Sequence, residues 1–369
     1  MKPTLFTPFE LASVTLPNRI VVSPMCQYSA DDGAVTDWHL QHLMQLAISG
    51  AGLIMVEATA VEPIGRITHG CLGLYRDSQE TRLERVLRAA RKVAPSGTRF
   101  GIQLAHAGRK ASVTLPWQGN APLTAEQQGW STVGPSDRPF ADGWPTPRAL
   151  SERDMADLVE AFVEATDRAV RLGFDVIELH FGNGYLGHQF LSPLANTRSD
   201  AYGGSRAGRQ RFPLQLAEAV HDRLPASVAM GVRLSATDWV DGGADLDDAI
   251  AFASQLRAIG SSYVCVTSGS VVPAKIPSGP AFLAPHAGQI RAAAAVPTRV
   301  SGMIATPEQA EAIVSSGQAD LVAIARGFLD DPRWVWHAAE HFGVTIDYPP
   351  QYQRSRPDVW PGAQLAHRR

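Results

Sequence analysis

Two kinds of segment alternate along the chain: short apolar runs, and longer segments in which apolar residues recur every three or four positions. The apolar runs are continuous and rich in β-branched residues, as in LIMVEA at 53–58 and DVIELH at 175–180. Such runs are typical of strands that are buried on both faces of a parallel sheet. The predicted strands are 19–25, 53–58, 100–105, 175–180, 228–235, 263–268, 298–302 and 320–325.

Segments with the helical period separate most of the predicted strands. Several of them begin at Ser, Thr or Asp and end at Gly, which are common boundary residues of helices. They occupy residues 38–49, 78–94, 151–173, 246–260 and 306–317. Apolar strands that alternate with amphipathic helices indicate a parallel α/β fold, and eight such strands favour closure into a (β/α)8 TIM barrel. An open, doubly wound sheet is the alternative.

A long segment rich in Pro, Gly and Trp, at about residues 106–150, separates the third predicted strand from its helix. Connections of this length inside a compact domain are usually lids or binding loops, so we expect a lid-like insertion here. We expect a single barrel domain over residues 1–345 that includes this insertion. Residues 346–369, which are also rich in Pro, are expected to form a C-terminal extension.

Composition and charge narrow the range of partners. The chain has 369 residues, 45% of them hydrophobic, and a formal net charge of −3, so it has no broad positive field to attract nucleic acid or an anionic membrane. Small-molecule partners are therefore favoured. Cys26, Cys71 and Cys265 are far apart in the sequence and provide neither a disulfide framework nor a metal-binding pair. Because no apolar segment is long enough for a signal peptide or a membrane helix, we expect a cytoplasmic protein.

The usual motifs of a separate nucleotide-binding domain or a metal site are absent from the sequence. SGAGLI at 49–54 precedes a predicted strand instead of following one, so it is not a dinucleotide-binding fingerprint. The sequence has no G-x-x-x-x-G-K-[ST] loop, no H-E-x-x-H pair and no cysteine cluster. We therefore predict no metal site and no separate nicotinamide-binding domain.

Polar residues gather where the predicted strands end, and barrel enzymes carry their chemistry at that end. The set is Ser23, Met25, Cys26, Tyr28, Gln103, His180, Asn183, Tyr185, Arg233, Gly302 and Arg326. The last two residues follow the seventh and eighth strands, where such barrels often bind a phosphate group. A phosphate-bearing cofactor or substrate is therefore expected.

Each of these residues also has a purely structural interpretation. His180 could be a hydrogen-bonded core histidine, and Tyr185 could be a packing residue. Arg326 could pair on the surface with Asp330 or Asp331. The basic residues after the third strand could be no more than a basic loop: His106, Arg109 and Lys110. It is the shared placement of the polar residues at one rim that favours a functional site.

Several longer motifs resemble those of the Old Yellow Enzyme family of FMN-dependent ene-reductases. The most specific is ELHFGNGYLGHQFLSPLANTRSDAYGGS at 178–205. The others, in the same order as in the family, include NRIVVSPMCQYS at 18–29, IQLAHAGRK at 102–110, VRLSATDW at 232–239 and DLVAIARGFLDDPRW at 320–334. PMCQY and the later QYQR at 351–354 are similar to the branch of xenobiotic reductases and thermophilic-like enzymes.

The resemblance implies one FMN in the barrel, with NADPH or NADH as the reductant. The positions that match FMN-binding residues are Ser23, Pro24, Met25, Cys26, Ala58, Gln103, Arg233, Gly302, Ala325 and Arg326. Gln103 can pair with the polar edge of the flavin, and Arg233 can stabilise the negative charge of the reduced ring. Ala325 departs from the glycine that many members carry before the phosphate-binding arginine.

The resemblance also assigns residues that act on the substrate. His180 and Asn183 would donate hydrogen bonds to the oxygen of an activated alkene, and Tyr185 would protonate its α-carbon. Positions that match substrate-binding residues are Cys26, Tyr28, Ile67, His180, Asn183 and Arg354. In some relatives the arginine of QYQR enters the neighbouring subunit's site, which implies a homodimer or homotetramer, although Trp360 could serve instead. His188 is expected to be structural.

The implied activity is reduction of α,β-unsaturated carbonyl or nitro compounds by NAD(P)H in a ping-pong exchange. Reduction of nitroesters or nitroaromatics as the main role is an alternative, and a non-catalytic flavin-binding barrel is another. Relatives of dienoyl-CoA reductase or trimethylamine dehydrogenase would need a cysteine cluster and an extra C-terminal domain. Three scattered cysteines in 369 residues argue against that group.

Overall fold

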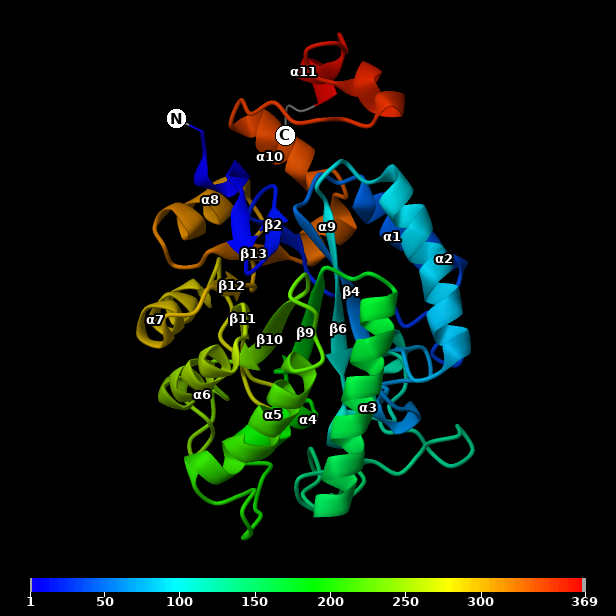
Figure 1. Ribbon diagram of the computed structural model, residues 1–369, viewed down its shortest axis with the longest axis vertical. Coiled ribbons are helices and arrows are strands. Elements are labelled where there is room, and N and C mark those ends of the chain that lie inside the picture. The colour runs from blue at the N-terminus through cyan, green and yellow to red at the C-terminus, as the bar shows by residue number, and fades with distance from the viewer. Residues whose placement is uncertain (1, 367–369) are drawn as a thin grey trace.

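Eight parallel strands close into a barrel in the computed structural model, which describes residues 2–366 (Figure 1). The strands are β3 (Ile20–Val22), β4 (Leu53–Ala60), β6 (Arg99–Ala105), β9 (Val176–Phe181), β10 (Ala229–Ser235), β11 (Tyr263–Thr267), β12 (Thr298–Val300) and β13 (Leu321–Ile324). The barrel is closed because β3 pairs with both β13 and β4. Each strand overlaps one of the predicted apolar runs, which confirms the TIM barrel and excludes the open sheet.

The barrel strands are buried on both faces, as their apolar composition predicts. Every residue of β4 and of β9 is buried. Inside the barrel, Leu53 and Val176 belong to a core at the amino ends of the strands. A hairpin of β1 (Phe9–Leu11) and β2 (Val14–Leu16) packs on this core and closes that end. The carboxyl ends of the strands are left to form the mouth.

Helices cover the outside of the barrel (Figure 1). The five predicted helices correspond to α1, α2, α3, α6 and α8, whereas α5, α7 and α10 were not predicted. None of the helices within residues 2–366 is long and apolar enough to cross a membrane. The bounds are α1 (Asp37–Ala47), α2 (Asp77–Val93), α3 (Glu152–Arg171), α4 (Leu186–Leu191), α5 (Arg206–His221), α6 (Leu246–Ile259), α7 (Ala284–Ala294), α8 (Pro307–Ser315), α9 (Arg326–Asp330), α10 (Trp334–His341) and α11 (Ala363–Ala366).

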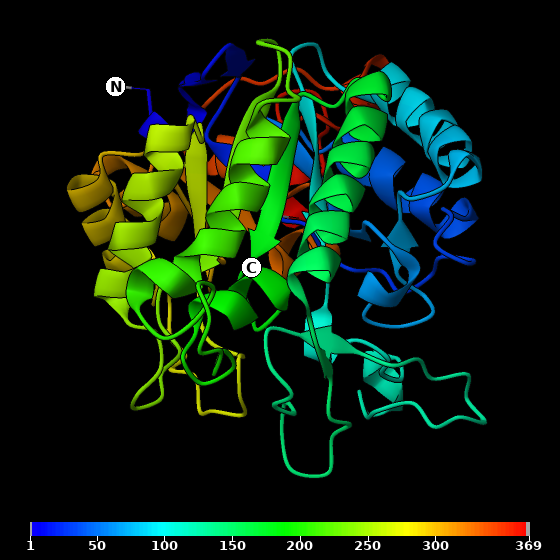
Figure 2. The same cartoon turned by 60° about the horizontal axis from the view of Figure 1, so that its bottom comes forward.

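The insertion between β6 and α3 extends away from the barrel at the mouth (Figure 2). Its elements are short: η3 (Gly108–Lys110), η4 (Pro116–Gln118), β7 (Val133–Gly134) and β8 (Arg148–Ala149). Arg109 ties the insertion to the loop after β11, because its guanidinium donates to the carbonyls of Arg138 and Val271. The insertion therefore lies beside the carboxyl ends of the strands.

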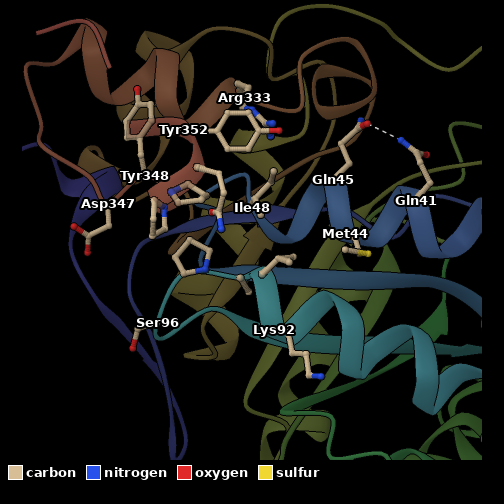
Figure 3. Close-up of a pocket in the computed structure, with 16 residues that line it drawn as sticks. Gln41, Met44, Gln45, Ile48, Lys92, Ser96, Arg333, Asp347, Tyr348 and Tyr352 are labelled. Atoms are coloured by element: carbon tan, nitrogen blue, oxygen red, sulfur yellow. Dashed lines mark hydrogen bonds between the residues drawn. The ribbon is translucent and has the colours of Figure 1, made fainter. Parts of the chain in front are cut away.

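The C-terminal extension lies at the other end of the barrel, at the top of Figure 1, and includes η5 (Pro350–Ser355). It packs on α10 through aromatic rings: the centroid of Trp336 is 4.2 Å from that of Tyr348 and 5.8 Å from that of Tyr352. An open groove of about 840 Å³ separates the extension from the carboxyl-terminal ends of α1 and α2 (Figure 3).

Candidate functional site

A cavity of about 640 Å³ opens at the carboxyl ends of the barrel strands. The predicted site residues that line it are Ser23, Asn183, Arg233, Gly302, Ala325 and Arg326. Apolar side chains line it as well, among them Ile276, Phe282, Leu283 and Ile304. Sites for cofactors and other small molecules usually have volumes of about 300–1,000 Å³. The mouth of the barrel therefore provides a cavity of the usual size for a small-molecule or cofactor site.

The loops after β12 and β13 form one side of this cavity. Gly302 has a φ of +121°, and a Cβ there would lie 3.0 Å from Cε1 of Phe282. Arg326 lines the cavity at the start of α9. The alternative surface pairing with Asp330 or Asp331 is not supported, because Arg326 forms no ion pair with either carboxylate within residues 2–366, and Oδ2 of Asp331 lies 2.6 Å from Nδ1 of His337. The guanidinium of Arg326 and the turn at Gly302 therefore lie on the same side of the cavity.

Arg233 projects from β10 into the same cavity and is the register partner of His180 in β9. Its Nε is buried and has no hydrogen-bond partner among residues 2–366. A buried donor without an acceptor is costly unless a ligand or water supplies one. The cavity is therefore suited to a ligand that carries hydrogen-bond acceptors or negative charge.

His180 lies near the carboxyl end of β9 with its ring buried. The backbone N–H of Gly182 donates to its Nδ1 at 3.3 Å, so the proton of a neutral ring is on Nε2. Burial lowers the pKa of His180 well below its usual range, and the charges of Arg233 and Lys110 lower it further. The imidazole is therefore a neutral N–H donor.

Tyr185 stands in edge contact with His180, with 4.9 Å between the ring centroids. Burial raises the pKa of Tyr185 well above its usual range, and the neighbouring Cys26 raises it further. The hydroxyl therefore stays protonated. Tyr185 packs in a small apolar cluster that brings together three of the predicted substrate residues, Cys26, Tyr28 and Ile67.

Asn183 follows β9 with a left-handed backbone, at a φ of 54°. Its backbone N–H donates to Oγ of Ser235 at 3.0 Å. Its side-chain Nδ2 donates to Oγ1 of Thr267 at 3.1 Å and to the carbonyl of Ser268 at 3.4 Å. Asn183 lines the cavity, yet both of its amide hydrogens are used within the protein in this arrangement.

Cys26 lies on the loop after β3 as a free thiol. Burial raises the pKa of Cys26 well above its usual range, and Cys71 and Glu57 raise it further, so the thiol is protonated. The loop is fixed by Glu57, whose Oε2 accepts the backbone N–H of Gln27 at 2.9 Å. The other oxygen of Glu57 lies 3.3 Å from Nε2 of the buried His39.

A buried polar network inside the barrel holds Gln103. Nε2 of Gln103 donates to Oε1 of Glu178 at 2.7 Å. The other carboxylate oxygen of Glu178 accepts from the hydroxyl of Tyr263 at 2.8 Å and from the guanidinium of Arg299. All four side chains are buried. The sequence did not predict this network, because its members lie in strands whose pattern is otherwise apolar.

Lys110 does not belong to a solvated basic loop, which corrects that interpretation of the sequence. Its Nζ donates to the carbonyls of Asn183 at 2.9 Å and Ser270 at 3.0 Å, and it lies 5.2 Å from the ring centroid of Tyr185. Burial, with a smaller contribution from the charge of Arg109, lowers the pKa of Lys110 to about 8. Lys110 thus joins the insertion to the turn that carries Asn183 and Tyr185.

The remaining predicted site residues fall into two places. Ala58 lies opposite Gln103 in the register of β4 and β6, and Pro24 and Met25 lie in the loop that leads to Cys26. Arg354 is different, because it is exposed on η5 at the end of the barrel away from the mouth (Figure 1). Within one chain, therefore, Arg354 does not join the site.

Comparison with known sequences gives a consistent family. A family model described as NADH:flavin oxidoreductase / NADH oxidase matches residues 4–343. A protein named NADPH dehydrogenase from Geobacillus thermodenitrificans (strain NG80-2) is 39% identical over 356 residues, which cover 96% of this chain and 99% of that protein. A second NADPH dehydrogenase, from Listeria innocua serovar 6a, is 40% identical over 353 residues, or 95% of this chain and 98% of that protein.

Solved structures with the same architecture agree. Morphinone reductase matches with a TM-score of 0.76 at 28% identity, over 95% of this chain and 93% of that one. A 2-naphthoyl-CoA reductase complex matches with a TM-score of 0.83 at 21% identity over 92% of this chain. This chain spans 52% of that longer protein, and at such low identity the likeness supports the fold alone.

Proposed function

Since this chain belongs to the NADH:flavin oxidoreductase / NADH oxidase family, we propose that it is an ene-reductase of the Old Yellow Enzyme type. The family identifies FMN as the cofactor and NAD(P)H as the reductant. The observation that carries the proposal is the pairing of a neutral imidazole donor, His180, with a protonated phenol, Tyr185. Their ring centroids are 4.9 Å apart. Neither ring lines the cavity of about 640 Å³ into which Arg233 projects. Tyr185 lines a separate small pocket with Ala58 and Ile67, and His180 is the register partner of Arg233.

The cavity fits FMN on two observations. The buried Nε of Arg233 lacks an acceptor among the described residues, and the flavin ring and phosphate are rich in acceptors. The turn at Gly302 is closely packed against Phe282, so a side chain at position 302 would force the Phe282 ring to move. When bound, FMN supplies hydride transfer from NAD(P)H to the substrate. The residues that would hold it are Ser23, Pro24, Met25, Cys26, Ala58, Gln103, Arg233, Gly302, Ala325 and Arg326.

His180 would stabilise the charge that develops on the substrate. When hydride reaches the β-carbon of an activated alkene, negative charge collects on the conjugated carbonyl or nitro oxygen, and a preorganised donor lowers that barrier. Nε2–H of His180 is available because Nδ1 already accepts from Gly182. Asn183 would be the second donor once its 3.4 Å contact with Ser268 is released.

Tyr185 would complete the reduction by protonating the α-carbon. A phenol whose pKa burial has raised remains protonated across the neutral range, so it can give a proton to a strongly basic carbanion-like centre. Cys26, Tyr28 and Ile67 pack around it and would shape the space for the alkene. Nicotinamide and alkene would use this one mouth in turn, which gives ping-pong kinetics.

We expect Gly184→Ala to lower the rate of alkene reduction far more than the backbone strain of an alanine at this position would by itself. The φ of Gly184 is +75°, and an added Cβ would lie 1.9 Å from the backbone oxygen of Ser270. The turn must then shift, and a shift of about 1 Å can cost about 100-fold in rate. Gly204→Ala is the control, since its φ is +65° with nothing within 4 Å of the added Cβ. Equal alkene reduction rates in the two variants would contradict the expectation.

The chain is also proposed to act as a homodimer or homotetramer in which Arg354 completes a neighbour's site. Its exposure on η5, far from its own mouth, supports this arrangement. Arg354→Ala should raise the KM for the alkene about 3- to 10-fold, which is the loss of one hydrogen bond. Arg356→Ala, in the same extension, is the control. Light scattering that gives the mass of a single chain would contradict the assembly.

Product analysis tests the proposed function. The FMN-loaded protein, NADPH and 2-cyclohexen-1-one should give cyclohexanone, with the carbonyl intact. Formation of 2-cyclohexen-1-ol would mean reduction at the carbonyl carbon and would overturn the assignment. NADPH oxidation by oxygen alone, with the enone unchanged, would also overturn it.

A further inference from the structure

Two side chains of α4 hold the turn that carries Asn183 and Tyr185, and both act on Gly184. The backbone N–H of Gly184 donates to Nδ1 of His188 at 2.8 Å. The carbonyl of Gly184 accepts from Nε2 of Gln189, also at 2.8 Å. Both side chains are buried. The peptide groups on either side of Gly184 are therefore fixed by side-chain contacts instead of by a regular strand or helix.

The acceptor role of His188 requires one particular tautomer. Because Nδ1 accepts the N–H of Gly184, the proton of the neutral ring must be on Nε2. That nitrogen lies 2.8 Å from Oδ1 of Asp238. The other oxygen of Asp238 accepts from Oγ of Ser192 at 2.6 Å and from the backbone N–H of Ala244 at 2.7 Å. The contact does not have hydrogen-bond geometry, since neither Nε2 of His188 nor Oδ1 of Asp238 has a hydrogen-bond partner within residues 2–366. A carboxylate held 2.8 Å from Nε2 nevertheless favours, by its charge, the tautomer that carries the proton on that nitrogen.

We propose that His188, whose tautomer Asp238 favours, is a positioning residue for the reaction proposed above. By holding the peptide between Asn183 and Gly184, it sets where the amide of Asn183 and the phenol of Tyr185 stand relative to the substrate. The inference rests on the proposed function for its kinetic consequence, but the hydrogen bond and the tautomer can be tested without it.

The surroundings of the turn make its position depend on this contact. Gly184 packs directly on the backbone of Ser270, since even a Cβ would lie 1.9 Å from that oxygen. Lys110 reaches the carbonyls of both Asn183 and Ser270. If the hydrogen bond between His188 and Gly184 is lost, the turn can move at Gly184 only by displacing these neighbours.

Nitrogen NMR of the histidine rings tests the tautomer in the FMN-loaded enzyme. With ¹⁵N-labelled histidine, the His188 signals, assigned by their loss in His188→Asn, should show a protonated Nε2 and an unprotonated Nδ1. In Asp238→Asn the amide nitrogen can face Nε2, and the proton should move to Nδ1, where it opposes the N–H of Gly184. A protonated Nδ1 in the wild type would overturn the proposal.

Rates of the two half-reactions test the positioning role. His188→Leu removes the acceptor and should slow reoxidation by 2-cyclohexen-1-one about 10- to 100-fold, because the donor and the acid are displaced. His188→Asn keeps an acceptor at the δ position and should restore most of that rate. Reduction by NADPH should change little in either variant. A purely structural role would lower both half-reactions together or neither, and either of those results would overturn the proposal.

The two proposals fail in different ways. If the wild-type enzyme does not reduce enones but its His188 ring shows the expected tautomer, the proposed function is wrong, and the hydrogen bond between His188 and Gly184 is still supported. If the wild type reduces enones and His188→Leu does so at the same rate, the positioning role is wrong and the proposed function stands.

Discussion

Tyr185→Phe is expected to lose alkene reduction by about 100- to 10,000-fold, which is the usual contribution of a general acid. The loss should be confined to the half-reaction with the alkene, since Tyr185 has no proposed part in reduction by NADPH. It should be larger for an enone than for a nitroalkene, because a nitro-stabilised anion is a weak base that can leave before it is protonated. Anaerobic stopped-flow absorbance measures the two half-reactions separately.

Tyr75→Phe is the matched control for Tyr185→Phe. It removes a buried hydroxyl that has no hydrogen-bond partner within residues 2–366, and Tyr75 lines neither the cavity at the strand ends nor the small pocket beside Tyr185. Both half-reactions should be unchanged in that variant. If Tyr185→Phe reduced 2-cyclohexen-1-one as fast as the control, the proposed proton donor would be wrong.

Breaking the buried pair of Glu178 and Arg299 should have the largest effect on stability. Both side chains are fully buried, and either single substitution, Glu178→Leu or Arg299→Leu, leaves the other charge without its partner. Such a loss typically costs about 3–5 kcal/mol in the free energy of unfolding. The double substitution removes both charges and should be closer to the wild type than either single variant. Urea unfolding of all four proteins, at one FMN concentration, measures this cycle.

An exposed pair provides the control for the buried one. Nε of Arg153 lies 2.9 Å from Oδ1 of Asp157 on the surface of α3, where both side chains are more than half exposed. Arg153→Leu should cost less than about 1 kcal/mol, as solvent screens such pairs. Equal costs at the two sites, or a double variant less stable than both singles, would contradict the role given to the buried pair.

The strands were predictable from the sequence because burial on both faces leaves them continuously apolar. The helices were less uniform. α5 carries Pro213 and the polar segment RAGRQR, and α7 is rich in Ala, so neither shows the clear period that identifies α3. Tertiary packing against the sheet stabilises such helices more than their own propensity does. Their existence therefore could not be predicted from local pattern.

The site was predictable only in part, for a similar reason. His180, Tyr185 and Arg233 are chemically distinctive residues at strand ends, and the strand order alone brings them to one mouth. Lys110 and Glu178 are different, because their roles depend on contacts between segments distant in sequence. Lys110 extends from the insertion to the carbonyl of Asn183, and Glu178 contacts Arg299 inside the barrel. No local pattern marks a charged residue in such a place as buried.

The anaerobic visible spectrum of the purified protein tests the central claim most directly. The protein should show the absorbance of oxidised FMN, which NADPH should bleach and 2-cyclohexen-1-one should then restore in the absence of oxygen. Recovery of the oxidised spectrum would establish both half-reactions at one flavin. Bleaching by NADPH without recovery on addition of the enone would contradict the ene-reductase assignment, and a colourless protein that takes up no FMN would contradict the flavin site itself.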